Sequence, residues 1–333
     1  MKVDVHKQYT PSEALELGIS INLFGYPILD KAKDMRDDFL VPPFSIVDAC
    51  DSEWIKRRNR WNKLIGDKGE TREGLLMRES TTQTKLAKKL KDYNGNVSIL
   101  DACLAELICK WFGVEGFEAF DPFAGDTVFG FVSSYLGFKF QGIDVRQEQV
   151  DVNNERLQLA GFNDSGYVCD TSVNIAKYVM PNSKDLVFTC PPYCDMEVYS
   201  DNPNDLSTMS TAAFFEVYGQ IMRGTYTTLK DNRFAVVVVG EVRDAKTGFY
   251  KQLVNKTINT MVEAGYHYYN EIIVVTSIGT LPFRAGRVMS IGRKVGKRHQ
   301  NVLVFYKGND HKKIREVFPE LANPNDYYNT EKQ

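Results

Sequence analysis

The segment from Phe117 to Asp144 constrains the fold of this 333-residue chain more than any other part of the sequence. A short apolar run ends at Asp121, turns through Pro122 and Gly125, and enters a stretch with apolar residues at helical spacing. A second apolar run over 139–144 ends at another acid, Asp144. Strand, glycine turn, helix and strand with an acid at its tip make half of a nucleotide-binding α/β unit. The glycine allows backbone to approach a ligand closely, and the second acid can accept both hydroxyls of a ribose.

A second feature follows one α/β unit later, at 185–193. There an apolar strand runs directly into Cys190-Pro191-Pro192-Tyr193. Both prolines fix φ and lack a backbone donor, so the loop is stiff and its carbonyl groups point outward. Stiff carbonyl acceptors beside an aromatic ring suit a planar ring that bears an amino group. The alternative is a plain Pro-Pro turn with a core tyrosine.

Together the two loops resemble those of the DNA amino-methyltransferases, which use S-adenosylmethionine (SAM). That family has Asp-Pro-Phe-x-Gly-x-Gly in its cofactor loop and Asp/Asn/Ser-Pro-Pro-Tyr/Phe in its catalytic loop. This chain has Asp121-Pro-Phe-Ala-Gly125-Asp-Thr127 and Cys190-Pro-Pro-Tyr193. The resemblance covers residues 97–306, and the first third looks like a segment that precedes this domain in phage-type DNA modification proteins.

The resemblance implies a site-specific DNA methyltransferase with SAM as its cofactor. Its substrate would be the exocyclic amine of cytosine (N4) or adenine (N6), on a base flipped out of the duplex. Asp121 would bind the methionine amino group, Asp144 the ribose hydroxyls and Asp170 the adenine amine, although each of the last two could instead be a helix N-cap. The predicted cofactor-binding residues are Asp121, Pro122, Phe123, Ala124, Gly125, Thr127, Asp144, Val145, Asp170 and Thr171.

The same resemblance assigns catalysis to Cys190, Pro191, Pro192 and Tyr193, with Tyr193 stacked on the base. Cys190 departs from the family, which has Asp, Asn or Ser there. A thiol is a poor acceptor, so polarisation of the amine would rest more on main-chain carbonyls. Cys190 is close in size to Ser, which is usual at this position in N4-cytosine enzymes, and the resemblance therefore favours cytosine N4. The C5-cytosine enzymes place their nucleophilic Cys after Pro-Pro, whereas Cys190 precedes it, so this comparison excludes that role. Thr127 replaces the family's second glycine.

The rest of the chain continues to alternate between helix and strand. We expect helices from 51 and at 96–111, 147–160, 171–178, 212–229 and 248–264, and strands at 166–169, 186–189, 233–239, 266–276 and 301–306. The last two strands have no helix between them and should be antiparallel. This predicts an α/β, Rossmann-like class I methyltransferase fold: a mostly parallel seven-stranded sheet with a reversed last strand. The predicted domains are a helical and irregular N-terminal extension (1–95), the methyltransferase domain (96–310) and a tail (311–333).

Two basic clusters are candidates for DNA contact, although a net charge of −2 does not by itself indicate a nucleic-acid binder. The first shares a predicted helix with Trp54 and Trp61. The second is the glycine-rich, acid-free stretch 280–300, which we expect to be a flexible loop. A solvated basic face and a plain surface loop are the alternatives. The predicted DNA-binding residues are Arg57, Arg58, Arg60, Arg284, Arg287, Arg293, Lys294, Lys297 and Arg298.

The cysteines, the apolar runs and two further segments bear on metal binding, location and the lining of the site. The six cysteines form no CxxC pair and have no accompanying histidines, so neither a metal site nor a disulfide framework is indicated. No signal core or long apolar run occurs, which predicts a cytoplasmic protein without a membrane partner. The resemblance implies that the cell is bacterial or phage-infected. We expect 194–205 to form an acidic lid, and Glu241 and Arg243 to line the pocket or pair with each other.

Two other functions remain open from the sequence. The same fold could act on RNA or on a protein amide, or the chain could be a non-catalytic DNA-binding protein that keeps the fold. The sequence does not decide between adenine and cytosine, between monomer and homodimer, or whether a restriction enzyme accompanies the protein.

Overall fold

The computed structural model describes residues 7–17, 21, 25, 34–66, 76–77, 99–194, 197–198, 200, 202–244, 246–279 and 281–322. The chain divides into two compact units, residues 1–43 with 319–333, and residues 44–318. The described part of the first unit contains helices α1 (Pro11–Leu17) and α2 (Met35–Phe39). Among the described helices of the chain, none has the length and apolar character to cross a membrane.

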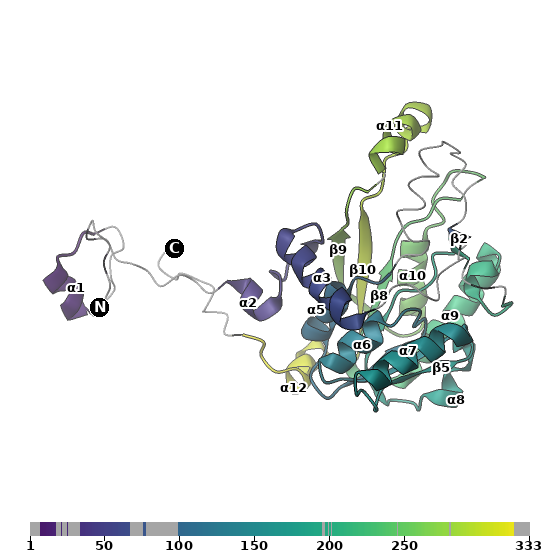
Figure 1. Ribbon diagram of the computed structural model, residues 1–333, viewed down its shortest axis with the longest axis horizontal. Helices are drawn as coiled ribbons and strands as arrows, with labels where there is room; N and C mark the ends of the chain where they lie inside the picture. The colour runs from purple at the N-terminus through teal and green to yellow at the C-terminus, as the bar shows by residue number, and fades with distance from the viewer. Residues whose placement is uncertain are drawn as a thin grey trace. The chain divides into compact units, whose positions relative to one another are not determined.

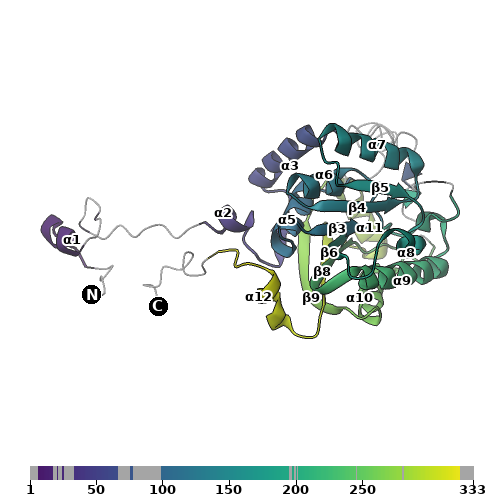
Figure 2. The same cartoon turned by 90° about the horizontal axis from the view of Figure 1, so that it is seen from below.

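The second unit is built on an eight-stranded sheet in the order β1-β9-β10-β8-β6-β3-β4-β5 (Figures 1 and 2). Strand β10 is antiparallel to both of its neighbours, and the other pairings in this sheet are parallel. This is the predicted Rossmann-like class I methyltransferase arrangement with its reversed last strand. The strands are β1 (Ile46–Asp48), β3 (Glu118–Asp121), β4 (Lys139–Asp144), β5 (Gly166–Cys169), β6 (Lys184–Thr189), β8 (Leu229–Val239), β9 (His267–Val275) and β10 (His299–Lys307).

Strand β1 is an eighth strand that the sequence does not predict. It extends the sheet beyond β9, where the Ile273 amide donates to the Ser45 carbonyl at 2.7 Å and the Ala49 amide to the Val275 carbonyl at 3.0 Å. Three residues are too few to give a periodic signal in the sequence, so this strand is identified only by its pairing with β9 in the structure. A separate two-stranded sheet joins β2 (Leu76–Met77) to β7 (Glu197–Val198).

Helices cover both faces of the main sheet (Figure 2). Helices α5 and α6 contact each other, and α6 and α7 contact β4 and β5, whereas α9 and α10 contact each other and the strands β8, β9 and β10. The apolar core between the sheet and α9 includes Phe120, Val187, Val237 and Phe214, all fully buried. The helices are α3 (Ser52–Ile65), α5 (Ala102–Phe112), α6 (Val128–Tyr135), α7 (Gln147–Leu159), α8 (Ile175–Tyr178), α9 (Thr211–Thr228), α10 (Leu253–Glu263), α11 (Leu281–Gly292) and α12 (Ile314–Val317).

Helix α5 begins later than predicted. Its N-cap is Asp101, whose carboxylate accepts from the Cys103 amide at 2.9 Å, and residues 96–98 lie outside the described ranges. Two acceptable cap residues, Asn96 and Asp101, precede the same apolar run, and the sequence alone does not choose between them. Helix α10 likewise starts at Leu253, because the preceding residues form a turn in which the Lys251 amide donates to the Val242 carbonyl.

Helix α11 corrects the expectation of a flexible loop over 280–300. It leaves the sheet between β9 and β10 and projects beyond the ends of those strands (Figure 1). Pro282 lies in its first turn, where a missing N–H leaves no helical hydrogen bond unmade, and Gly292 is its last residue. This start-and-stop pattern is present in the sequence, but the many glycines and cations around it favour a loop.

Candidate active site

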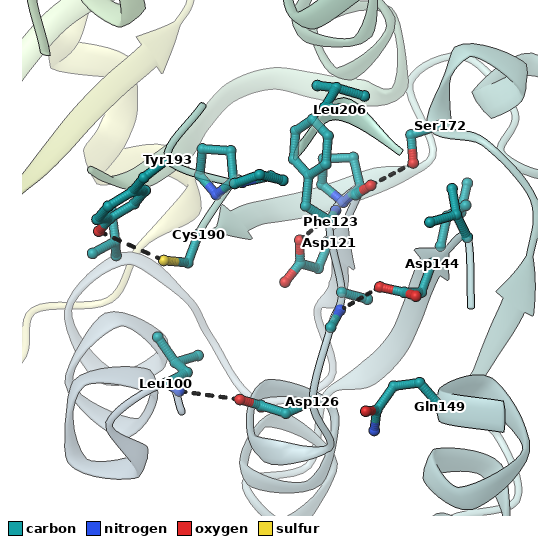
Figure 3. Close-up of a pocket in the computed structure, with 18 of the residues that line it drawn as sticks. Leu100, Asp121, Phe123, Asp126, Asp144, Gln149, Ser172, Cys190, Tyr193 and Leu206 are labelled. Atoms are coloured by element: carbon teal, nitrogen blue, oxygen red, sulfur yellow. Dashed lines mark hydrogen bonds between the residues drawn. The ribbon is translucent and has the colours of Figure 1, made fainter. Parts of the chain in front are cut away.

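The candidate site lies where the direction of chain progression across the sheet reverses. The chain passes from β3 outward to β4 and β5 and then returns to β6 on the opposite side of β3, which opens a crevice at the carboxyl ends of the strands. The two central strands are tied together at this edge, because the Thr189 hydroxyl donates to Asp121 Oδ1 at 2.5 Å. A cavity of about 600 Å³ opens here, lined by both loops that the sequence singles out (Figure 3).

The first loop, 121–125, is held against the end of β4. The Gly125 amide donates to Asp144 Oδ2 at 3.0 Å, while Asp144 Oδ1 accepts from the Arg146 amide at 2.8 Å. Gly125 has φ of +48°, a backbone conformation that favours glycine. Asp121 is 4% exposed and accepts from the Phe123 amide at 2.9 Å. The two acids that end β3 and β4 therefore border the same cavity, as Figure 3 shows.

Burial dominates the electrostatics of these two acids. Desolvation raises the pKa of Asp121 to about 7, and the nearby Asp126 and Asp144 add to the rise, while hydrogen bonds from Thr189 and Phe123 oppose it. Desolvation also raises the pKa of Asp144 to about 6, against hydrogen bonds from the Arg146 and Gly125 amides. A carboxylate that is removed from water gains from any cation or hydroxyl donor that enters beside it. The cavity therefore suits a ligand that carries both.

The second loop, 190–193, forms the opposite part of the lining (Figure 3). The Gln300 amide nitrogen donates to the Tyr193 hydroxyl at 3.0 Å, and the Cys190 thiol donates to the same oxygen at 3.8 Å. A Cβ atom on Gly240 would lie 3.2 Å from the edge of the Tyr193 ring. The ring is therefore fixed at its hydroxyl by β10 and packed against backbone at the end of β8.

The segment before α5 lines a third side of the cavity. The Leu100 amide donates to Asp126 Oδ2 at 3.1 Å, which ties this segment to the loop before α6. Arg58 of α3 donates to Asp101 Oδ2 at 3.2 Å, and both residues also line the cavity. An N-terminal helix thus contributes to the wall of the candidate site.

Most predicted cofactor residues line the cavity, and the exceptions are Thr127 and Asp170. Thr127 is fully buried, and its hydroxyl donates to Asn153 Oδ1 at 2.6 Å. Asp170 accepts from the Tyr178 hydroxyl at 2.7 Å and from the Asn174 side-chain amide at 2.9 Å, so its carboxylate is engaged within the segment 170–178. The predicted catalytic residues, Cys190, Pro191, Pro192 and Tyr193, all line the cavity.

Several lining residues escape the sequence analysis. Gln149 on α7, Thr276 and Ser277 after β9 and Gln300 at the start of β10 have no motif around them. Ser172, whose hydroxyl donates to the Pro122 carbonyl, could have been found from its place just after β5. From the predicted lid, Asn204 and Asp205 line the cavity, and so does Leu206, which directly follows it.

The basic cluster on α3 is largely engaged within the protein. Arg57 makes a two-point contact with Glu106 of α5, with Nε 2.6 Å from Oε2, and Arg58 pairs with Asp101. Trp54 and Trp61 also donate their indole N–H groups to Asp101 and Glu106, at 3.0 and 2.7 Å. Arg60 is exposed. Arg57 and Arg58 therefore join α3 to α5, and contact of this cluster with DNA stays a prediction.

The second basic cluster is divided between anchored and exposed side chains. Lys297 donates to Asn301 Oδ1 at 3.0 Å, and Arg298 donates to the Thr276 carbonyl at 2.8 Å. Lys294 lies against Gly248, whose added Cβ would be 2.4 Å from the ammonium nitrogen. Arg287 and Arg293 are exposed, and the Arg284 side chain lies outside what the structure describes.

Glu241 and Arg243 neither line the cavity nor pair with each other, which corrects both expectations. Glu241 Oε1 accepts from the Val254 amide at 3.0 Å, at the N-terminus of α10. The Arg243 guanidinium stacks on the Tyr250 ring, 3.9 Å from its centroid. Within the described ranges, no cluster of His, Cys, Asp and Glu side chains could hold a metal ion.

Neither a protein-family model nor a curated protein sequence matches this chain. Solved structures with a similar fold include TrmN from Thermus thermophilus, with 14% identity over 62% of this chain and 49% of that chain and a TM-score of 0.42. The chain thus spans about half of the TrmN chain. A TehB-like SAM-dependent methyltransferase from Corynebacterium glutamicum has 14% identity over 67% of this chain and 95% of that chain, with a TM-score of 0.39.

Phosphoethanolamine N-methyltransferase 2 from Haemonchus contortus, solved in complex with SAM, has 16% identity over 62% of this chain and 53% of that chain, with a TM-score of 0.41. At such identities and TM-scores, the likeness to these proteins says nothing of what this chain binds or acts on.

Proposed function

We propose that this protein is a SAM-dependent methyltransferase that acts on the exocyclic amino group of a base in DNA. One observation carries the proposal. The loop that ends in Gly125, with Asp121 and Asp144 beside it, and the Pro-Pro-Tyr loop that follows β6 line one cavity at the reversal point of the sheet. A cofactor site and an amine-binding loop are thereby adjacent, as transfer between them requires.

The residues of the cavity fit SAM. Asp144 keeps lone pairs beyond those used by the Gly125 and Arg146 amides, and these can accept the two ribose hydroxyls. Asp121 is a buried carboxylate that an ammonium group would stabilise in its ionised form. Ile143 and Leu206 offer apolar surface for a purine. The volume of about 600 Å³ is in the ordinary range for small-ligand sites. SAM supplies an activated methyl group on a sulfonium.

The residues of the second loop have complementary tasks. Carbonyl groups of Cys190 or Pro191 accept the hydrogens of the substrate amine, which turns its lone pair out of conjugation with the ring. Tyr193, fixed by Gln300, offers a ring face on which the base stacks. Held between these groups, the amine would be aligned with the methyl group that bound SAM would supply, and would release its proton to solvent. Most of the rate enhancement comes from alignment of the two reactants.

Chemistry and charge support DNA as the substrate. Exposed cations on and after α11 lie in the insertion that joins two cavity-lining segments, Thr276–Ser277 and Gln300. Such cations bind phosphates irrespective of sequence. A base amine is paired inside the duplex, so the target base has to be extruded to reach Tyr193. Cys190, which is similar to Ser in size, favours cytosine N4 over adenine N6.

A transfer assay tests the proposal. The purified protein is incubated with methyl-labelled SAM and unmodified duplex DNA, and the DNA is digested to nucleosides. We expect label on N4-methylcytosine or N6-methyladenine, and at least a tenfold loss in a Tyr193→Ala variant that still binds SAM. Label on RNA or protein in place of DNA would contradict the substrate but not the cofactor. SAM binding without transfer to any of these would favour a non-catalytic DNA-binding protein.

A further inference from the structure

Helix α11 carries a stripe of exposed side chains that the fold does not use. Phe283, Arg287 and Ile291 follow one another at four-residue spacing and so share one face of the helix. Phe283 is 70% exposed and Ile291 is 76% exposed. Large apolar side chains exposed along one face of a projecting helix contribute little to the core and are typical of a binding surface.

The insertion that contains α11 is anchored beside the candidate active site. At its base the Thr276 amide donates to the Arg298 carbonyl at 3.1 Å, which continues the β9–β10 pairing. Above this, the Leu281 side chain packs on Gly296, where an added Cβ would lie 2.6 Å from it. Ser277 and Gln300, just outside the insertion, line the cavity. A partner bound by α11 is therefore held next to the cavity.

The charge of the insertion indicates a polyanion as that partner. No acidic residue occurs from Thr280 to Gln300, although acids outnumber cations in the chain as a whole. Arg287, between the two apolar side chains, and Arg293, after the helix, are exposed. Cations that flank an exposed apolar side chain are the arrangement by which proteins hold the backbone of duplex DNA and wedge a side chain between base steps.

We propose that α11 opens duplex DNA for the active site: Phe283 enters the base stack near the target, while Arg287 and Arg293 bind the flanking phosphates. This rests on the proposed function, since it assumes a base delivered to Tyr193. Extrusion of a base from a duplex costs unstacking and unpairing, whereas a single strand does not incur the pairing cost. The contribution of a wedge should therefore be confined to duplex substrates.

The test compares methylation of one sequence as a duplex and as a single strand. For Phe283→Ala we expect kcat/KM to fall about tenfold on the duplex and to change less than about twofold on the single strand. Val262→Ala, a half-exposed apolar residue on α10, is the matched control and should alter neither rate. Arg287→Gln should weaken binding to both DNA forms and reduce the slope of log affinity against log salt by about one.

Other outcomes would overturn the inference and separate it from the proposed function. An equal loss on both DNA forms, or no loss from Phe283→Ala, would exclude a wedge and leave DNA methylation standing. Conversion of a dimer to a monomer by Phe283→Ala would mark the stripe as a contact between two copies of the chain. Binding to anionic vesicles in preference to DNA would mark it as a membrane contact. A wild-type protein that labels neither DNA form would remove the proposed function itself.

Discussion

At the scale of single residues, the proposed role of Asp121 at the methionine end of SAM predicts that SAM binding depends on pH. Burial raises its pKa to about 7. An ammonium ligand binds the ionised form better, and the protonated form becomes dominant as pH falls below that value. We therefore expect SAM affinity to fall about tenfold between pH 7.5 and pH 6, with proton release on binding near pH 7. Calorimetry in two buffers of different ionisation enthalpy measures both.

An Asp121→Asn variant is the control for this titration. It should bind SAM more weakly than the wild type at pH 7.5, and its SAM affinity should depend on pH much less than that of the wild type. Asp144, whose pKa is raised to about 6, would contribute what is left below that pH. Wild-type affinity that stays constant or increases toward pH 6 would contradict the role of Asp121.

The position of the Tyr193 ring depends on the absence of a side chain at Gly240. A Cβ there would approach the ring to 3.2 Å, so Gly240→Ala should displace the ring. We expect the methyl-transfer rate to fall about tenfold, because misplacement of a reacting group costs rate, while SAM affinity stays within about twofold. Gly219→Ala on α9, where the nearest atom would be 3.4 Å away, is the matched control. Equal rates for both variants would show that this packing does not position the ring.

At the scale of elements, the attachment of α3 to α5 depends on a buried carboxylate. Glu106 is 5% exposed and receives hydrogen bonds from Arg57 and from the buried indole of Trp61. Glu106→Ala leaves that indole N–H without its acceptor, and we expect unfolding free energy to fall by about 2–3 kcal/mol. Arg60→Ala, on the exposed face of α3, should change it by less than about 0.5 kcal/mol. Urea denaturation measures both, and similar values would contradict this assignment.

The two basic clusters show why the roles of charged helices are harder to predict from sequence than the positions of strands. A run of cations on α3 has the same sequence signature whether the side chains face DNA or acids of another helix. Asp101 and Glu106, the partners of Arg58 and Arg57, lie more than 40 residues away, and no local pattern links them. Helix α11 is also hard to predict, because its glycines and cations are typical of a loop and only the positions of Pro282 and Gly292 indicate a helix.

At the scale of the whole molecule, the sheet was largely predictable. Apolar strands that alternate with amphipathic helices specify a parallel sheet, and two adjacent strands without a helix specify the reversed β10. Residues at strand tips, such as Asp121, Asp144 and the 190–193 loop, could therefore be placed together. Gln300 and Arg58 also line the cavity, but they could not be placed there from the sequence. They lie within a strand and a helix, and the side to which their side chains point depends on how those elements pack.

The central claim, that the cavity binds SAM through the acid at the end of β4, can be tested with two matched substitutions. Asp144 is the last residue of β4, and Asp170 directly follows the neighbouring strand β5. Asp144 lines the cavity, whereas Asp170 does not. We expect calorimetry to show SAM binding by the wild type. Asp144→Asn should weaken it about 10- to 100-fold, since charge-assisted hydrogen bonds to the ribose are lost. Asp170→Asn should change it less than about threefold. No binding by the wild-type protein, or equal losses in the two variants, would contradict the assignment of this cavity.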